Sequence, residues 1–196
     1  MNDHKGFFAM MARMKYIERW ALMRNSVSEN ICEHSLEVAM LAHGLGIIGR
    51  KRFGKDLSPE RLAMLGMYHD CTEIITGDMP TPVKYANDEL KEAYKAIEDS
   101  AAQRLLEMLP EDLRAEYESY FLPEQITPEE YRYVKAADKL SALIKCIEEE
   151  KTGNQEFRSA KQATYESLQQ MNMPEVTVFC EVFLPEYYKT LDELEH

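Results

Sequence analysis

Two histidines and two aspartates along the chain carry side chains that divalent metal ions prefer. They are His34, the adjacent pair His69 and Asp70, and Asp138. Imidazole nitrogens and carboxylate oxygens form a mixed donor set that suits Co²⁺, Mn²⁺, Zn²⁺ or Fe²⁺. Four protein ligands leave room on a six-coordinate ion for water and a substrate oxygen. The chemistry that this set predicts is metal-assisted hydrolysis.

Each of these residues has an ordinary explanation when it is taken alone. A histidine on an apolar helix face is more often a hydrogen-bonded core residue than a ligand. Asp138 could pair with Lys135 or Lys139 on a solvated face. The metal hypothesis rests on the conjunction, because buried aspartates need compensating charge and a cation supplies it. The remaining histidines are weaker candidates for metal ligands. His43 lies about 180° around the helix from His34, and His4 and His196 lie near the termini.

The elements that must position these residues are predicted to be helices. Eight Gly and eight Pro in 196 residues leave little room for the turns of an all-β fold. Ser58-Pro59 and Thr127-Pro128 each place a capping residue before a proline, which is typical of a helix start. We expect helices over 58–77, 127–151, 87–109 and 30–49. The segment 175–183 alternates like a strand but has no evident partner, so a helix is favoured there.

The predicted helices direct the candidate ligands toward the interior. His34 recurs with Ile31 and Val38 on one apolar stripe. His69 shares a stripe with Gly66, whose lack of a side chain would let another backbone approach. Asp138 has small residues one turn later, which indicates close packing against it. The sequence therefore predicts one all-α domain over residues 1–196, folded as a compact multi-helix bundle.

Composition limits the partners. The net charge is −12, which argues against a polynucleotide and an anionic membrane surface. Residues 1–24 nevertheless carry five basic residues against two acidic ones, so a small anion can still be attracted. The longest uncharged run, Val38–Gly49, is too short for a bilayer, and Phe7–Ala12 is too short for a signal peptide. Four cysteines without metal-site spacing are expected to be reduced and buried, in a cytoplasmic protein.

The order of His34, then His69-Asp70, then Asp138 resembles the metal signature of the HD superfamily of phosphohydrolases. More specifically, the chain resembles the bacterial HD-domain 5′-deoxynucleotidases over most of residues 7–157. Cys71-Thr72 and Met79 depart from the pattern without touching a ligand. The matching stretches are Arg19-Trp20, Leu22-Met23-Arg24-Asn25, Glu29-Asn30, Glu33-His34-Ser35, Met67-Tyr68-His69-Asp70, Glu73, Thr76-Gly77-Asp78, Pro80-Thr81-Pro82-Val83-Lys84-Tyr85 and Lys135-Ala136-Ala137-Asp138.

The resemblance implies hydrolysis of a (2′-deoxy)nucleoside 5′-monophosphate to nucleoside and phosphate, in a homodimer. Arg19 suits a phosphate because its planar fork matches two oxygens, and Trp20 beside it would orient the phosphate or sugar. Glu73, one turn beyond the HD pair, is placed for proton transfer, and Asp78 is expected to contact the substrate or protonate the leaving group. The implied substrate site comprises Arg19, Trp20, His34, Asp70, Asp78, Met79, Pro80, Thr81 and Asp138.

Two other functions stay open at this point. One is an HD hydrolase that acts on another phosphorylated nucleotide, such as a triphosphate, which would need more basic residues than Arg19 and Lys84. The other is a helical binding module with a structural metal, against which the two aspartate ligands count. A ferritin-like di-iron site is disfavoured because its Glu-x-x-His pairs are missing.

Overall fold

The computed structural model describes residues 5–84 and 86–195. Within these ranges the fold is all-α, as predicted, and the β-type pairing is an isolated antiparallel bridge between Glu18 and Asn30. The α-helices are α1 (Phe7–Met11), α2 (Ile31–Phe53), α3 (Pro59–Tyr68), α4 (Glu73–Thr76), α5 (Thr81–Lys84), α6 (Asp88–Leu106), α7 (Glu111–Phe121), α8 (Pro128–Lys151), α9 (Arg158–Gln170), α10 (Pro174–Val182) and α11 (Leu191–Leu194). Short 3₁₀ helices are η1 (Ala12–Tyr16), η2 (Pro123–Gln125) and η3 (Leu184–Tyr188).

The two longest helices begin at the capping residues that the sequence indicates. The side chain of Asn30 accepts hydrogen bonds from two amides of the first turn of α2, and Glu33 completes a capping box. Thr127 does the same for α8 with Glu130. Helix α2 continues four residues further than expected, to Phe53, and is capped by Gly54 in a left-handed conformation with φ 65°. The helix predicted over 175–183 is confirmed as α10.

The single helix predicted over 58–77 is wrong, because α3 ends at Tyr68 and α4 begins at Glu73. The break falls on His69 and Asp70, the HD pair. The Nδ1 atom of His69 lies 2.7 Å from the carbonyl oxygen of Gly66, which the amide of Asp70 would bind in a continuing helix. The chain then tightens through the bond from the Cys71 amide to the Tyr68 carbonyl. The predicted helix over 87–109 also ends early, at Leu106 in α6.

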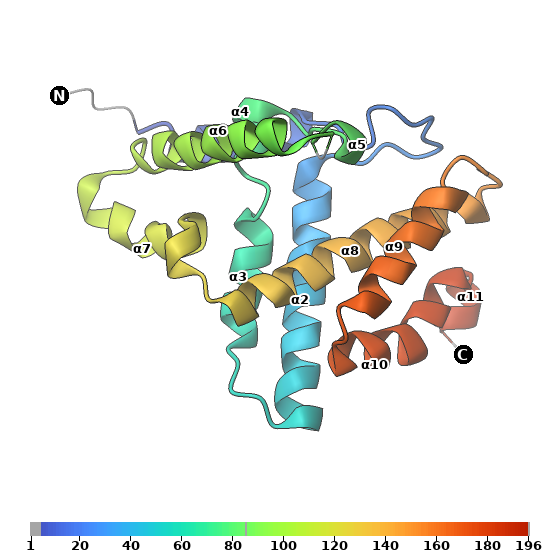
Figure 1. The fold of residues 1–196 in the computed structure, drawn as a ribbon. Coiled ribbons are helices and arrows are strands. Elements are labelled where there is room, and N and C mark those ends of the chain that lie inside the picture. Colours follow the sequence, from blue (N-terminus) through green and yellow to red (C-terminus); the bar gives the residue numbers. More distant parts are fainter. Residues whose placement is uncertain (1–4, 85, 196) are drawn as a thin grey trace.

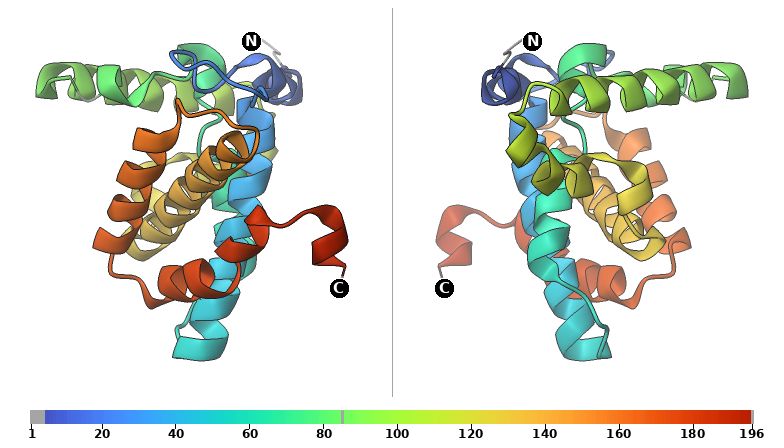
Figure 2. Two further views of the ribbon diagram at one scale, coloured as in Figure 1. Left: turned by 90° about the vertical axis from the view of Figure 1, so that its right-hand side faces the viewer. Right: turned by 90° about the vertical axis from the view of Figure 1, so that its left-hand side faces the viewer.

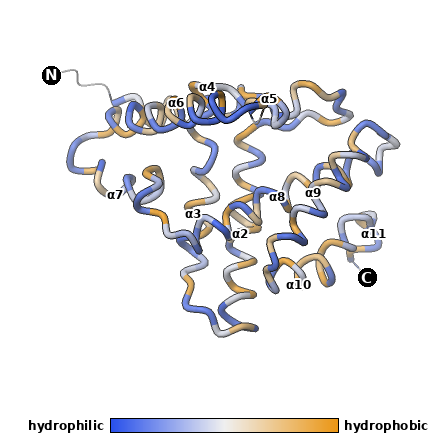
Figure 3. The backbone as a smooth tube through the Cα atoms, viewed as in Figure 1, coloured by the Kyte–Doolittle hydropathy of each residue, from blue (hydrophilic) through white to orange (hydrophobic). Residues whose placement is uncertain are grey.

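Helices α2 and α3 run side by side, α8 crosses them, and α6 lies across one end of α2 (Figure 1). Gly66 of α3 makes the predicted close approach, since an added Cβ would lie 3.0 Å from Ala39 Cα on α2. Hydrophobic and hydrophilic positions alternate along these helices (Figure 3). By length and composition α2 could span a membrane, with hydropathy 1.2 and 56% of that stretch buried. The mostly buried core helix of a globular fold passes the same test, so one such helix is weak evidence for a membrane span.

The buried side chains form two hydrophobic clusters. The larger one joins α2, α3, α8, α9 and α10, and includes Val38 and Leu140. The smaller one joins α1, the start of α2, the end of α6 and α7, and includes Ile31 and Cys71. His34 follows Ile31 and precedes Val38 by about one helical turn each, so it lies where the two clusters meet. The C-terminal α11 stands away from the body (Figure 2).

The four cysteines are all free thiols, as expected. Cys71 and Cys146 are buried and Cys180 is half-buried, but Cys32 is exposed. The prediction of burial is wrong for Cys32 because it lies in the first turn of α2, one position past the core-facing Ile31.

Candidate metal and substrate site

The four candidate ligands come together from three segments: α2, the turn between α3 and α4, and α8. Donor atoms of His34, His69 and Asp70 all lie within 4.8 Å of one another. The Nε2 atom of His34 is 3.5 Å from Asp70 Oδ2 and 3.3 Å from Asp138 Oδ1. The Nε2 atom of His69 is 3.0 Å from Asp70 Oδ2 and 4.0 Å from Asp138 Oδ1. The four side chains therefore converge in the structure, and their role as metal ligands stays a prediction.

The hydrogen bonds of the two imidazoles fit a metal ion. The Nδ1 atom of each ring forms a hydrogen bond with a protein oxygen. For His34 this oxygen is Ser141 Oγ, at 2.9 Å, and for His69 it is the Gly66 carbonyl oxygen, at 2.7 Å. A carbonyl oxygen only accepts, so the Nδ1 of His69 carries the proton. The Nε2 atoms of both rings are buried without a hydrogen-bond partner. Bare nitrogens facing two carboxylates are the donors that a divalent cation requires.

Burial and mutual charge set the protonation of this group. Burial, together with the Arg19 cation, lowers the pKa of His34. Burial also acts to lower the pKa of His69, but Asp70 outweighs it and the pKa is raised. Burial opposes ionisation of Asp70, yet His69 holds its pKa below the usual range. Asp138 is half-buried, and Lys135 and the histidines hold its pKa well below that range. Both aspartates therefore stay ionised, and negative charge gathers at the convergence point.

Arg19 and Trp20 lie beside this group, on the segment that links η1 to α2. The Arg19 guanidinium donates to Glu29 at 3.2 Å and approaches Asp70 Oδ2 at 3.5 Å. The indole Nε1 of Trp20 donates to the same Glu29 oxygen at 2.8 Å, and the ring packs edge-on against Phe157 at 5.2 Å. Trp20 has a backbone φ of 60°, a conformation that residues other than glycine rarely adopt. Arg19 is thus held next to a candidate ligand, and Trp20 is held beside Arg19 by their shared partner Glu29.

The segment that carries Arg19 and Trp20 is tied to the far end of α8 by Glu149. This buried carboxylate accepts from the amides of Ser26, at 2.8 and 3.1 Å, and of Val27, at 3.2 Å. The buried Lys145 Nζ and the Asn154 amide also donate to it. Sequence reasoning missed Glu149 because it lies 123 residues from Ser26 and belongs to no local pattern.

Glu73 and Asp78 follow the HD pair and face the same region. Burial and the charges of Asp70 and Asp78 raise the pKa of Glu73 to about 10. Its Oε2 atom is buried without a hydrogen-bond partner. Burial also raises the pKa of Asp78, against the lowering effect of the Arg19 cation. A carboxyl group that holds its proton beside a cluster of ionised acids is suited to proton transfer.

The remaining predicted residues are less well connected. Met79 and Pro80 are half-buried and Thr81 is exposed at the start of α5. Within residues 5–84 and 86–195, no side-chain hydrogen bond or ion pair joins these three to the ligand group. Lys84 forms an ion pair with Glu98 at 2.8 Å, so its cation already has a partner. His43 lies about two and a half turns further along α2 from His34, on the opposite side of the helix, and His4 and His196 lie outside the described residues.

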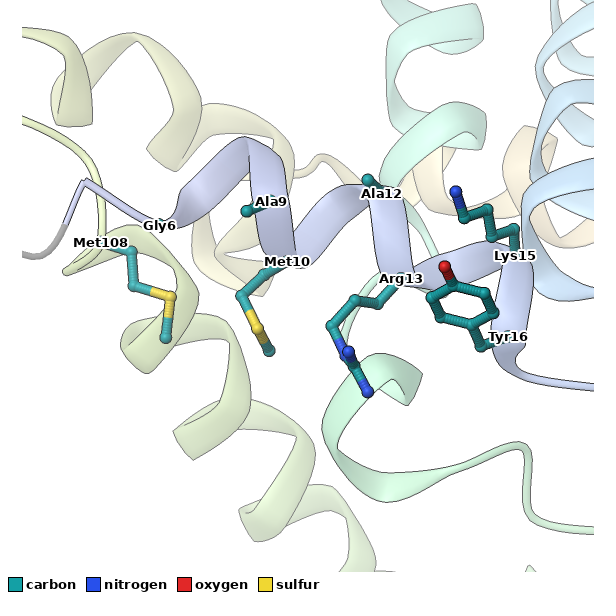
Figure 4. Close-up of a pocket in the computed structure, with 8 residues that line it drawn as sticks. All are labelled: Gly6, Ala9, Met10, Ala12, Arg13, Lys15, Tyr16 and Met108. Carbon is teal, nitrogen blue, oxygen red and sulfur yellow. The ribbon is translucent and has the colours of Figure 1, made fainter.

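An open groove of about 600 Å³ follows one side of α1 and η1, away from the ligand group (Figure 4). It is lined largely by apolar side chains, with two cations and no acid or histidine. None of the residues predicted for the site belongs to it. The lining residues are Gly6, Ala9, Met10, Ala12, Arg13, Lys15, Tyr16 and Met108.

Solved structures place the fold in a known class. An HD-domain phosphohydrolase from Listeria innocua superposes with a TM-score of 0.80 at 22% identity, covering 96% of this chain and 91% of that one. The cyanophage S-2L HD phosphohydrolase DatZ, solved with dA and one catalytic Zn²⁺, gives a TM-score of 0.64 at 23% identity, with 93% and 96% covered. The bundle therefore has the fold of HD-domain phosphohydrolases.

Sequence comparisons identify one family within this class of proteins. A 5′-deoxynucleotidase of Vibrio cholerae is 48% identical over 188 residues, 96% of this chain and 97% of that protein. The 5′-deoxynucleotidase YfbR of Shigella boydii is 46% identical over 188 residues, with 96% and 94% covered. The model of the 5′-deoxynucleotidase YfbR-like family matches residues 6–187. The chain belongs to this family, which confirms the resemblance drawn from the motifs.

Proposed function

We propose that this protein hydrolyses 2′-deoxynucleoside 5′-monophosphates to deoxynucleosides and inorganic phosphate, with a divalent metal ion. The observation that carries the proposal is the pair of bare imidazole nitrogens, on His34 and His69, facing two ionised aspartates beside Arg19. The relatives named 5′-deoxynucleotidase, and the zinc and dA in DatZ, support this reading. The metal would be held by His34, His69, Asp70 and Asp138.

When bound, such an ion supplies a water molecule of lowered pKa and offsets charge on the phosphoryl oxygens. Arg19 lies 3.5 Å from a ligand carboxylate, so its guanidinium can bind phosphate oxygens next to the ion. The side chains of His34, Asp70 and Asp138 lie together in the ligand group and would border the bound phosphate. Hydrolysis adds water across the P–O bond, and the deoxynucleoside 5′-oxygen leaves with a proton.

Glu73 is the group that we assign to proton transfer. It is buried, its free oxygen lacks a partner, and it holds a proton beside ionised acids. Asp78 would contact the sugar or assist protonation of the leaving oxygen, because burial raises its pKa too. Trp20 gives a rigid wall that would exclude a 2′-hydroxyl. The loop residues Met79, Pro80 and Thr81 would close the substrate site.

A monophosphate suits the charges near the site better than a triphosphate. Arg19 is already shared between Glu29 and Asp70, and Lys84 is paired with Glu98. A triphosphate tail would need further cations to offset its charge. We further propose that the protein is a homodimer that acts in the cytoplasm with Co²⁺, Mn²⁺ or another borderline transition metal ion. We also propose that it binds neither polynucleotides nor membranes.

The test is a phosphate-release assay on all ribo- and deoxynucleoside 5′-monophosphates, with a series of divalent ions and an EDTA control. We expect turnover of deoxynucleotides that EDTA abolishes and an added ion restores. Asp70→Ala should lose bound metal and activity while keeping its helical circular dichroism. The exposed Asp56 provides the matched control, Asp56→Ala. Lack of hydrolysis by the metal-loaded protein would refute the proposal, and light scattering of the eluted protein would test the dimer.

A further inference from the structure

Beyond the ligands, a chain of two side chains continues from His34 toward the surface. Ser141 on α8 places its Oγ atom 2.9 Å from His34 Nδ1 and 2.5 Å from Glu37 Oε2. Glu37 lies one turn after His34 on α2, and Ser141 lies one turn after Asp138 on α8. Ser141 and His34 are fully buried, whereas Glu37 is half-buried. The chain therefore bridges the two helices that supply one ligand each.

Burial raises the pKa of Glu37 to about 7. Above that pH Glu37 is ionised, and the donors and acceptors of this chain then allow one arrangement. A carboxylate only accepts, so the single Ser141 hydroxyl proton points to Glu37. The Ser141 oxygen can then serve His34 only as an acceptor, which places the imidazole proton on Nδ1. The Nε2 atom is left bare, on the side where Asp70 and Asp138 lie.

The two imidazoles differ in the partner that holds the proton on Nδ1 and leaves Nε2 free. The Nδ1 of His69 is held by a backbone carbonyl, so no side-chain substitution removes its partner. The Nδ1 of His34 has its hydrogen bond with Ser141 and is linked through it to Glu37, while Oε1 of Glu29 lies 3.7 Å from the same nitrogen. Partners of this kind orient a ligand imidazole and fix its tautomer, and their loss typically weakens metal binding by about 10- to 100-fold.

We propose that Ser141 and Glu37 are positioning residues that hold His34 with its Nε2 atom free for the metal ion. Neither residue belongs to the proposed metal ligands or substrate contacts. The inference rests on the metal site of the proposed function, but not on the identity of the substrate.

The experiment measures the affinity of the purified protein for Co²⁺ and Mn²⁺ by calorimetry, without nucleotide, together with the visible absorption of bound Co²⁺. Ser141→Ala should raise the Kd about 10- to 100-fold and alter the Co²⁺ spectrum. Glu37→Ala should act in the same direction, because Ser141 is then free to donate to His34. Glu37→Gln keeps an acceptor oxygen and should recover part of the affinity.

Ser35 supplies a matched control. It is buried next to His34 on the same helix, but its Oγ atom has no hydrogen-bond partner. Ser35→Ala should therefore leave the Kd and the Co²⁺ spectrum unchanged. Circular dichroism checks that each variant is folded, and the half-buried Glu37 tests the chain if Ser141→Ala does not fold.

The outcomes separate this inference from the proposed function. If Ser141→Ala and Glu37→Ala bind Co²⁺ as the unsubstituted protein does, or if Ser35→Ala loses as much affinity, the positioning role is refuted. If the affinities change as expected but no deoxynucleotide is hydrolysed, the positioning role stands and the proposed function fails. If the unsubstituted protein binds neither ion, both are overturned.

Discussion

The indole Nε1 of Trp20 donates a 2.8 Å hydrogen bond to Oε2 of Glu29, the same oxygen that receives the guanidinium of Arg19 at 3.2 Å. One carboxylate oxygen therefore fixes both neighbouring residues of the proposed phosphate and sugar contacts. The backbone helps, since the amide of Arg19 donates to the carbonyl of Glu29 at 2.9 Å. The bond to Trp20 also offsets part of the strain at its positive φ.

Glu29→Gln is expected to raise the KM for deoxynucleotides about tenfold and to change kcat less. Hydrogen bonds to a charged acceptor contribute about 1.5–3 kcal/mol, and a neutral amide oxygen holds the two donors less firmly. Steady-state kinetics on a deoxynucleoside monophosphate measures the split. Glu18→Gln, an exposed acid on the same segment, is the control. A KM that stays equal in both variants would contradict this role for Glu29.

Glu73→Gln is expected to keep the metal and the fold but to lower kcat at least about 100-fold. The amide has the size of the protonated acid but cannot transfer a proton, and general acid–base groups contribute about 10²–10⁴-fold. Turnover at saturating deoxynucleotide and metal content by atomic absorption check this. An unchanged kcat would remove Glu73 from the reaction.

Gly66→Ala is expected to destabilise the protein by roughly 1–3 kcal/mol. The new Cβ would lie 3.0 and 3.1 Å from backbone atoms of Ala39 and 3.1 Å from the carbonyl carbon of Val38, none of which is a flexible side-chain end. Urea unfolding measures the change. Gly44 on α2 has no atom within 4 Å of an added Cβ. Gly44→Ala should therefore stabilise by up to about 1 kcal/mol, and equal effects at the two sites would contradict the close contact.

Glu149→Gln is expected to lower stability most near neutral pH. Burial opposes ionisation, but Lys145, Asn154 and two amides lower the pKa of Glu149 from 4.5 to about 2. The folded state thus favours the ionised form. Its contribution, of the order of 3 kcal/mol, is complete above pH 4.5 and is lost as the pH falls toward 2.

The measurement is the free energy of unfolding in urea from pH 7 to pH 2.5. The difference between the unsubstituted protein and Glu149→Gln should shrink toward low pH. Glu124→Gln, at an exposed position in η2, should show little difference at any pH. A difference for Glu149→Gln that stays constant with pH would show that the carboxylate does not act through its charge.

Local patterns in the sequence predict the parts of the site that lie on regular helices. The apolar stripe around His34 and the capping residues Asn30 and Thr127 are local, so helix periodicity reveals them. The turn at His69 has no such local signal. It forms because the His69 side chain binds the Gly66 carbonyl, which the amide of Asp70 would bind in a continuing helix. Residues that act between distant segments leave no periodic signal. Ser141 lies 107 positions from His34, and Glu149 lies 123 from Ser26.

The ligand group lies at the junction of the two hydrophobic clusters, with Ile31 on one side of His34 and Val38 on the other. An ion bound there joins two bodies that could otherwise loosen independently. Binding to the folded state alone adds about 2.7 kcal/mol when the free ion is at 100 times its Kd. Metal loading should therefore make unfolding more cooperative, so that the ion acts as a cross-link of the fold as well as a reagent.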